Sequence, residues 1–138
     1  MIPRFRIWLK KKKKMVATDD LVNISFEDEE ICVQTLYFEE GLISERDLDY
    51  YEFDEIEFIQ PTGVKDKNGK EIFEGDIVDY KGRKAVIKWH GSYASFIYRF
   101  VDELQERVSE WHPLFLAYYH FEVIGNIYKN KELFEDGK

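Results

Sequence analysis

The segment that most constrains the fold of this chain runs from residue 61 to residue 80 and reads PTGVKDKNGKEIFEGDIVDY. Asn68 and Gly69 suit a tight type I′ turn, because both central residues of that turn need a positive φ, which asparagine tolerates and glycine adopts freely. Residues 64–65 are therefore expected to lie opposite residues 71–72 in an antiparallel hairpin. The segment specifies a local architecture and does not by itself indicate a reaction.

The strand pattern continues beyond this hairpin. Gly75, next to Asp76, redirects the backbone into a β-branched run at residues 77–80. Alternating or β-branched runs elsewhere also predict strands. We expect a first hairpin from residues 4–8 and 15–17, a second from 21–26 and 31–37, and further strands at 50–60, 84–89, 93–101 and 115–127. The chain is thus expected to be mainly β with antiparallel strands.

Short helical segments are expected at three places. Ser44 can cap one turn that ends near Leu48. Apolar residues recur at helical spacing in the segment 102–111, which favours a short helix there. Asn130 can cap a final turn before a frayed tail at residues 131–138.

The charge of the chain is unevenly distributed. A net charge of −8 opposes broad electrostatic binding to nucleic acid, whose phosphates repel an acidic surface. The first 15 residues nevertheless contain seven basic side chains and no acid: Arg4, Arg6, Lys10, Lys11, Lys12, Lys13 and Lys14. These residues could contact phosphates while Phe5 and Trp8 stack on bases. The alternative interpretation is a charged turn that discourages pairing between sheet edges.

The cysteine content and the N-terminal segment bear on the cellular compartment. Cys32 is the only cysteine, which excludes an internal disulfide and fits a reducing cytoplasm. The lysine run follows a very short apolar patch, which is the reverse of a secretory signal. No apolar stretch approaches the length of a membrane span. A cytoplasmic location without membrane attachment is therefore expected.

The central segment fits neither a phosphate-binding loop nor a calcium-binding loop. A phosphate-binding loop needs a second glycine followed by Lys-Ser/Thr, and the spacing from Gly63 does not supply it. A calcium loop centred on Gly69 would place Val64 at its first ligand position and Gly75 at its last, so two essential oxygen ligands are missing. A hairpin turn explains the same residues better.

The remaining reactive side chains do not form a known catalytic or metal-binding pattern. His90, His112 and His120 include no His-x-x-x-His pair, and Cys32 alone cannot complete a cysteine-rich zinc site. Cys32 could act as a nucleophile with a distant histidine, but a buried thiol on a strand is the simpler interpretation. The acids at 47–57 could hold a cation, yet their alternation with apolar residues favours the solvated face of a strand. We expect no enzyme activity, no cofactor and no metal.

Four segments resemble those of one known family. They are residues 5–8 with the lysines and Met15 that follow, residues 62–78, the strand at 86–89 and the closing run at 121–128. In this order they resemble the YopX proteins of phages and prophages. Six residues of these segments are interpreted as structural: Asn68, Gly69, Gly75, Asp76, Gly125 and Asn126.

The resemblance implies a fold and an origin but no activity. It implies a small phage or prophage β protein with an SH3-like barrel around residues 61–90, and it carries over no catalytic residue. We expect a single YopX-like domain over residues 1–138, with an N-terminal β subregion at 1–58, a barrel subregion at 59–130 and a tail at 131–138.

Aromatic residues near the closing strand suggest an interface. They are Trp111, Phe115, Tyr118 and Tyr119, and an exposed subset would mark a contact between identical subunits. The leading hypothesis is a non-enzymatic, self-associating module that binds an unidentified host or phage macromolecule. The alternative is a nucleic-acid-binding module that uses the basic N-terminal edge.

Overall fold

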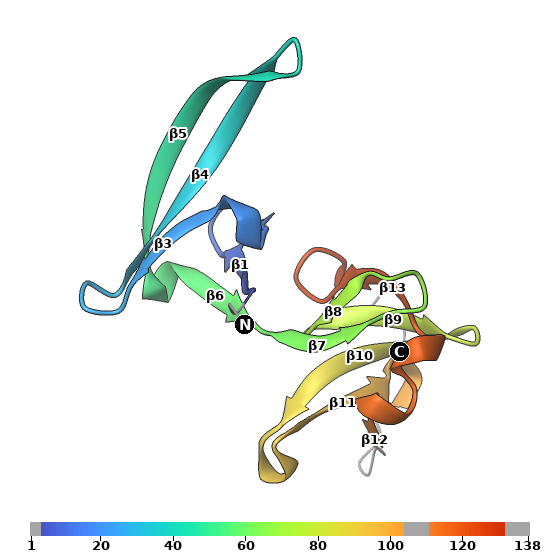
Figure 1. Ribbon diagram of the computed structural model, residues 1–138. Helices are drawn as coiled ribbons and strands as arrows, with labels where there is room; N and C mark the ends of the chain where they lie inside the picture. The colour runs from blue at the N-terminus through green and yellow to red at the C-terminus, as the bar shows by residue number, and fades with distance from the viewer. Residues whose placement is uncertain (1–3, 104–110, 132–138) are drawn as a thin grey trace. The chain divides into compact units, whose positions relative to one another are not determined.

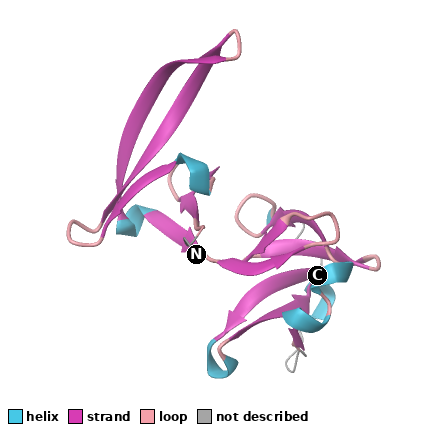
Figure 2. Cartoon of the chain, viewed as in Figure 1, coloured by secondary structure: helices cyan, strands magenta, loops and turns pink. Residues whose placement is uncertain are grey.

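The computed structural model describes residues 4–103 and 111–131. Figure 2 shows that their regular structure consists of strands and a few short helical turns, all of the 3₁₀ type. Every strand pairing among them is antiparallel. The predicted mainly β, antiparallel class is therefore confirmed. The chain divides into two compact units, residues 1–59 and 60–138, which are described separately.

The first unit contains a small sheet in the order β2-β1-β6. Its strands are β1 (Arg6–Leu9), β2 (Lys14–Val16) and β6 (Ile56–Ile59). The predicted first hairpin is present, since Ile7 lies opposite Val16 across β1 and β2. Its alternating apolar residues enter a core together with residues of the second sheet: Ile7, Leu9, Val16, Ile31, Val33 and Ile56.

The second sheet of this unit has the order β3-β4-β5. Its strands are β3 (Leu21–Ser25), β4 (Glu30–Glu39) and β5 (Leu42–Glu52). β3 pairs only with residues 30–33 of β4, so β4 and β5 continue beyond it as a two-stranded arm, seen in Figure 1. We call residues 34–48 the arm.

The helical turn predicted at Ser44 is wrong, because Ser44 lies within β5. Glu40 and Gly41 both have positive φ, 53° and 81°. They form a two-residue turn of the type I′ kind, which connects β4 to β5. Ser44 falls where the register shifts between Tyr37 and Phe38, which is a β-bulge. The pairing of two alternating strands outweighs the capping preference of one serine.

The strand predicted at residues 50–60 is interrupted. A 3₁₀ turn, η2 (Phe53–Glu55), separates β5 from β6. The backbone N–H of Phe53 donates to the carbonyl of Glu29 at 2.9 Å, and the Phe53 ring packs edge-on against Phe58 at 5.3 Å. The η2 turn, held by these contacts of the partly buried Phe53, leads the chain from one sheet into the other.

The second unit is built on a five-stranded sheet in the order β12-β11-β10-β9-β13. Its strands are β9 (Asp76–Tyr80), β10 (Arg83–His90), β11 (Ser95–Phe100), β12 (His112–Pro113) and β13 (Glu122–Asn126). The strands predicted at 84–89 and 93–101 are thus confirmed. One face of the sheet packs into the core of the unit: Ile72, Val78, Ala85, Ile87, Phe96, Tyr98, Phe100, Leu114, Ala117 and Phe121.

A separate two-stranded ladder precedes this sheet in the chain. It pairs β7 (Pro61–Lys65) with β8 (Glu71–Phe73). Across the part of the chain that the structure describes, no strand pairing joins this ladder to the five-stranded sheet, and β12 and β13 are the sheet's two edges. These pairings establish antiparallel sheets and do not close a barrel.

The central hairpin has the expected pairing but a different turn. Lys65 lies opposite Glu71, as predicted. Gly69 has a φ of +82°, whereas Asn68 does not have a positive φ, so the predicted type I′ turn is wrong. The Asp66 N–H donates to the Lys70 carbonyl at 2.8 Å, which defines a three-residue loop. The side chain of Asp66 favours this loop, since it accepts the N–H groups of Asn68 and Lys70 at 2.9 Å.

A tight turn with two left-handed residues occurs one hairpin later. Lys81 and Gly82 have φ values of 52° and 87°, and they connect Tyr80 to its cross-strand partner Arg83. This is the geometry of a type I′ turn. The sequence predicted a type I′ turn at Asn68-Gly69, whereas the structure has one at Lys81-Gly82, with lysine at the first central position.

The strand predicted at residues 115–127 is confirmed only at its end, in β13. The preceding residues form two 3₁₀ turns, η5 (Leu114–Leu116) and η6 (Tyr118–His120). These turns bury Leu114, Ala117 and Phe121, which a straight strand would not place on one face. Most of the helix predicted at 102–111, and the turn predicted after Asn130, lie outside the described residues.

Candidate functional site

The arm has one apolar face. Cross-strand partners share a face, and β4 and β5 pair Cys32 with Tyr50, Gln34 with Leu48, Leu36 with Arg46 and Phe38 with Ile43. We define the apolar arm face as the apolar members of the pairs beyond β3, which are Leu36, Phe38, Ile43 and Leu48, together with Tyr50, which lies opposite Cys32 at the base of the arm. Phe38, Ile43 and Tyr50 are 64%, 60% and 62% exposed. Large apolar side chains gathered this closely in solvent mark an interaction surface.

The opposite face of the arm is acidic. It carries Glu45, Asp47 and Asp49, together with the exposed ring of Tyr37. A hydrogen bond to Asp47, reinforced by the negative charge of that group, raises the pKa of Tyr37. The arm is therefore two-sided, with carboxylates on one face and apolar side chains on the other.

The edges of the arm are open within the described chain. β5 pairs only with β4, and β4 has no second partner beyond Val33. Unpaired edge strands are templates for pairing with another chain, and a two-stranded hairpin has little stability alone. The unpaired edges and the exposed apolar face are both features of a surface that binds another protein chain.

The lysine turn between β1 and β2 is exposed and partly engaged with acidic and aromatic groups. The Lys10 ammonium donates to the Asp54 carbonyl at 3.1 Å and lies 3.9 Å from the Glu57 carboxylate. Lys12 lies over the Tyr51 ring, 5.4 Å from its centroid, and a hydrogen bond to that tyrosine is the largest cause that raises the pKa of Lys12.

Other members of the predicted basic edge are dispersed. Arg4 lies 3.7 Å from the Asp19 carboxylate, and Arg6 is half-buried in β1. Lys11 and Lys14 are exposed, and Lys13 adopts a left-handed backbone with a φ of 51°. A small cavity of about 70 Å³ lies beside this turn, lined by residues that include Lys12, Lys14 and Asp20. It has room for a few water molecules only.

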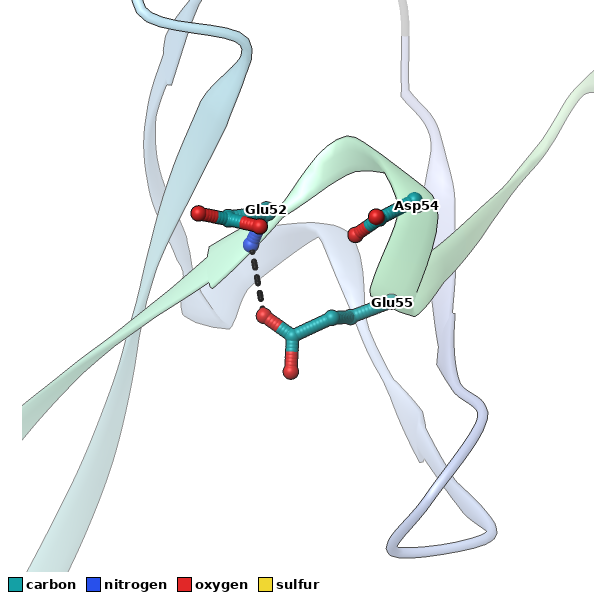
Figure 3. Close-up of side chains that lie close together, drawn as sticks. All are labelled: Glu52, Asp54 and Glu55. Atoms are coloured by element: carbon teal, nitrogen blue, oxygen red, sulfur yellow. Dashed lines mark hydrogen bonds between the residues drawn. The ribbon is translucent and has the colours of Figure 1, made fainter.

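Three carboxylates meet at the η2 turn, as Figure 3 shows. Oxygens of Glu52, Asp54 and Glu55 lie within 4.8 Å of one another. The Glu55 carboxylate accepts the backbone N–H of Glu52 at 3.0 Å, which stabilises the turn. The cluster is largely exposed, and these contacts explain it as turn geometry.

The four aromatic residues predicted to form an interface do not make one patch. Trp111 packs on His90 and Tyr93, with ring centroids 4.9 Å away in each case. Tyr118 is partly buried against the core, and its ring meets that of Tyr119 edge-on at 5.6 Å. Phe115 and Tyr119 are exposed. The set divides between the β10–β11 hairpin and the η5–η6 segment.

Sequence reasoning missed the apolar arm face. Its signal was available in the alternation on both sides of Glu40-Gly41, a pair that suits a type I′ turn. The alternation in β5 was overlooked because Ser44 suggested a helix cap. That Phe38 and Ile43 remain exposed depends on where β3 ends, which the sequence pattern does not reveal.

Asp66 connects the central loop to the closing strand. Asp66 is 6% exposed, and the second oxygen of its carboxylate accepts the N–H of Val123 in β13 at 2.9 Å. Burial alone would raise the pKa of Asp66, but the N–H donors of Val123, Lys70 and Asn68 outweigh burial and lower it.

Gly75 packs closely against side chains of the closing segment, and Asp76 follows it at the start of β9. Gly75 has a φ of +85°, and a Cβ there would come within 2.9 Å of the Tyr128 ring. Asp76 is buried and accepts the N–H of Phe73 at 2.8 Å. In the closing segment, Gly125 pairs with Ile77, and the Asn126 side chain accepts the N–H of Lys129 at 2.8 Å.

Comparison with known proteins assigns the family. The model of the family described as YopX protein matches residues 4–135. This chain belongs to the YopX family. Two solved structures are similar to it. Protein EF1440 from Enterococcus faecalis is 27% identical, with a TM-score of 0.58, and the match covers 97% of this chain and 99% of that chain. Protein yopX from Bacillus subtilis is 21% identical, with a TM-score of 0.54, and the match covers 94% of this chain and 96% of that chain. Comparison with curated proteins gives no match.

The YopX assignment names no reaction, and each histidine of this YopX-family chain packs on aromatic rings. His90 packs on Tyr93 and Trp111, His112 stacks on Tyr98, and His120 stacks on Tyr80. Cys32 is a buried free thiol in the first unit. Each histidine thus belongs to a different aromatic contact within the second unit.

Among residues 4–103 and 111–131, no helix has the length and apolar character needed to cross a bilayer.

Proposed function

We propose that this YopX-family chain is a non-enzymatic phage or prophage protein that self-associates in the bacterial cytoplasm and acts by binding a host or phage macromolecule. One observation supports self-association most directly: the apolar arm face is exposed on a hairpin with open edges. Phe38 and Ile43 form a cross-strand pair at its end and are both more than half exposed. Contact between identical subunits is the most common use of such a surface.

The sidedness of the arm fits packing between two copies through their apolar faces. Face-to-face packing buries Phe38, Ile43 and Tyr50 of each copy while Glu45 and Asp47 stay in water. The alternative, edge pairing of two β5 strands, brings several carboxylates of one copy near those of the other. Like charges in such positions are destabilising. Packing through the apolar arm face therefore removes apolar side chains from water and leaves the carboxylates of the opposite face solvated.

The contacts of the histidines support a binding role over catalysis. Catalysis by acid–base chemistry needs groups within hydrogen-bonding reach of one another or of a substrate. Here His90, His112 and His120 are each packed on aromatic rings in separate contacts. This is the arrangement of side chains that contribute to packing.

The proposal includes an SH3-like barrel around residues 61–90. The hairpins β7–β8 and β9–β10 follow one another in the chain, as consecutive strands of small barrels do. One backbone hydrogen bond also connects the end of the first hairpin to the second: the N–H of Gly75, two residues after β8, donates to the carbonyl of Ile87 in β10 at 2.8 Å. This contact supports the barrel without closing its ladder.

Sedimentation velocity at roughly 10 to 100 µM tests self-association. The wild-type chain is expected to sediment above monomer mass, and the double variant Phe38→Ser/Ile43→Ser as a monomer. The matched control is Tyr37→Ser/Leu42→Ser, which removes two exposed apolar side chains from the acidic side of the same arm. A wild-type monomer in this range, or equal loss of mass in both double variants, would refute the proposal.

A further inference from the structure

The five-stranded sheet has a second face that differs from its core face. Val86, Lys88 and His90 alternate along β10 with the residues of that core, so they point to the other side of the sheet, where Val86 is buried in a smaller cluster with Ile77 and Val101. Across the hairpin, Lys88 pairs with Ile97 and Val86 pairs with Arg99. Lys88 and Arg99 are therefore diagonal neighbours on this face. We call it the cationic sheet face and define it by Lys88, His90, Tyr93, Arg99 and Trp111.

The two cations of this face have no acidic partner in the described chain. Arg99 Nε is buried without a hydrogen bond to any described residue, and no ion pair joins Lys88 or Arg99 to a carboxylate there. The pKa of Lys88 is lowered mainly by burial and, to a smaller extent, by the positive charge of Arg99. A bound anion would relieve the repulsion between these cations.

Aromatic rings lie beside the cations. The rings of His90, Tyr93 and Trp111 are in mutual contact, with centroid separations of 4.8 Å for His90–Tyr93 and 4.9 Å for the other two pairs. Tyr93 is 63% exposed and Trp111 is 36% exposed, so the cluster retains solvent-facing π surface. Cations next to exposed aromatic rings are what single-stranded nucleic acid binds, since phosphates pair with the cations and unpaired bases stack on the rings.

The net charge of the chain does not oppose binding at this face as strongly as its total suggests. The first 59 residues carry 8 basic and 15 acidic side chains, whereas residues 60–138 carry 12 and 13. The unit that contains Lys88 and Arg99 is therefore nearly neutral. The acidic excess that argued against a nucleic-acid partner belongs to the sequence of the other unit.

We propose that the cationic sheet face binds single-stranded nucleic acid, with phosphates at Lys88 and Arg99 and a base stacked on Tyr93 and Trp111. A duplex keeps its bases paired and stacked on one another, so it cannot use the rings in this way. This inference adds a partner class to the binding role proposed above, at a surface that does not include the arm. It does not depend on self-association.

Fluorescence anisotropy with a labelled oligothymidylate of about 10 nucleotides tests this site. The wild-type protein is expected to bind at low salt with an affinity that falls as salt rises. In Lys88→Gln/Arg99→Gln, the slope of log K against log salt is expected to fall in magnitude by about 1.4, because two phosphate contacts are lost. Tyr93→Ala is expected to weaken binding by roughly tenfold while the slope stays unchanged.

The matched control is Lys65→Gln/Lys81→Gln, which removes two exposed lysines of the same unit outside the cationic sheet face. This control, and a variant with residues 10–14 changed to serine, are expected to keep wild-type affinity. Thermal melts establish that each variant is folded. The monomeric arm variant is expected to bind as well per subunit as the wild type, so this test and the sedimentation test fail independently.

Results of three kinds would overturn the proposal. The first is absence of wild-type binding at low salt. The second is equal weakening in the control variant, or loss of binding when the lysine turn is changed but not when Lys88 and Arg99 are. The third is a duplex of the same length that binds as tightly as the single strand.

Discussion

Replacing Gly75 with alanine should destabilise the second unit more than the same change at Gly82. The two glycines have nearly the same backbone, with φ values of +85° and +87°, so alanine bears the same conformational strain at both, about 1 to 2 kcal/mol. Their surroundings differ. A Cβ at Gly75 would meet Tyr128 Cε2 at 2.9 Å and Ile127 Cγ1 at 3.4 Å, whereas nothing lies within 4 Å of a Cβ at Gly82.

The backbone at Gly75 cannot move away from this contact without losing hydrogen bonds. Its N–H donates to Ile87 at 2.8 Å, and its carbonyl accepts the N–H of Ile127 at 2.9 Å. Overpacking in such a position costs roughly 1 to 3 kcal/mol beyond the strain. The expected losses are therefore about 1 to 2 kcal/mol for Gly82→Ala and about 2 to 5 kcal/mol for Gly75→Ala.

Urea denaturation followed by tryptophan fluorescence measures this difference. Trp89 and Trp111 lie in the same unit as both glycines, and the signal of Trp8 is common to all variants. With an m value near 1 kcal/mol/M, the two midpoints should differ by roughly 1 to 3 M. In a Tyr128→Ala background, the excess penalty at Gly75 should shrink toward the value at Gly82. Equal midpoints for the two alanine variants would refute the packing argument.

Three further changes test the contacts of the second unit by the same denaturation method. Asp66→Asn should cost about 2 to 3 kcal/mol at neutral pH, because an amide cannot accept all three N–H donors. Since the folded pKa of Asp66 is below 3.8, the wild-type advantage should be full above that value and disappear as pH falls through the folded pKa. Lys81→Asn should stabilise by a few tenths of a kcal/mol, since asparagine tolerates a φ of 52° better. Thr62→Val should cost roughly 1 kcal/mol, because its hydroxyl donates to the Ile72 carbonyl at 2.7 Å; no loss would exclude that bond as a contributor.

The hairpins could be predicted from the sequence because their signals are local. The hairpin on either side of residues 10–14 follows from the strand period and the turn residues within about ten positions. The pairing of Lys65 with Glu71 follows from the same local signals. The type of turn at Asn68 was mispredicted because a side chain before the turn, Asp66, competes for its N–H groups. Side-chain acceptors of this kind change a loop without changing the strands around it.

Other features depend on contacts between segments that are distant in sequence. Residues 114–121 form turns because Leu114 and Phe121 both enter the core, although their composition favours a strand. The cationic sheet face assembles residues from β10, the turn between β10 and β11, β11 itself and the residue before β12. Neither Lys88 nor Arg99 is distinctive in sequence, and only the cross-strand register places them together.

The bond between Asp66 and Val123 spans 57 positions of the chain. Nearby, the Lys67 N–H donates to the Phe121 carbonyl and the Ile127 N–H to the Gly75 carbonyl, both at 2.9 Å. During synthesis, the middle of the protein leaves the ribosome before the segment that satisfies these groups exists. Loops of this length are slow to close, so the second unit should acquire its final form only after residues near 127 have emerged. Formation of these three long-range hydrogen bonds would then be the event that commits this half of the molecule to its native state.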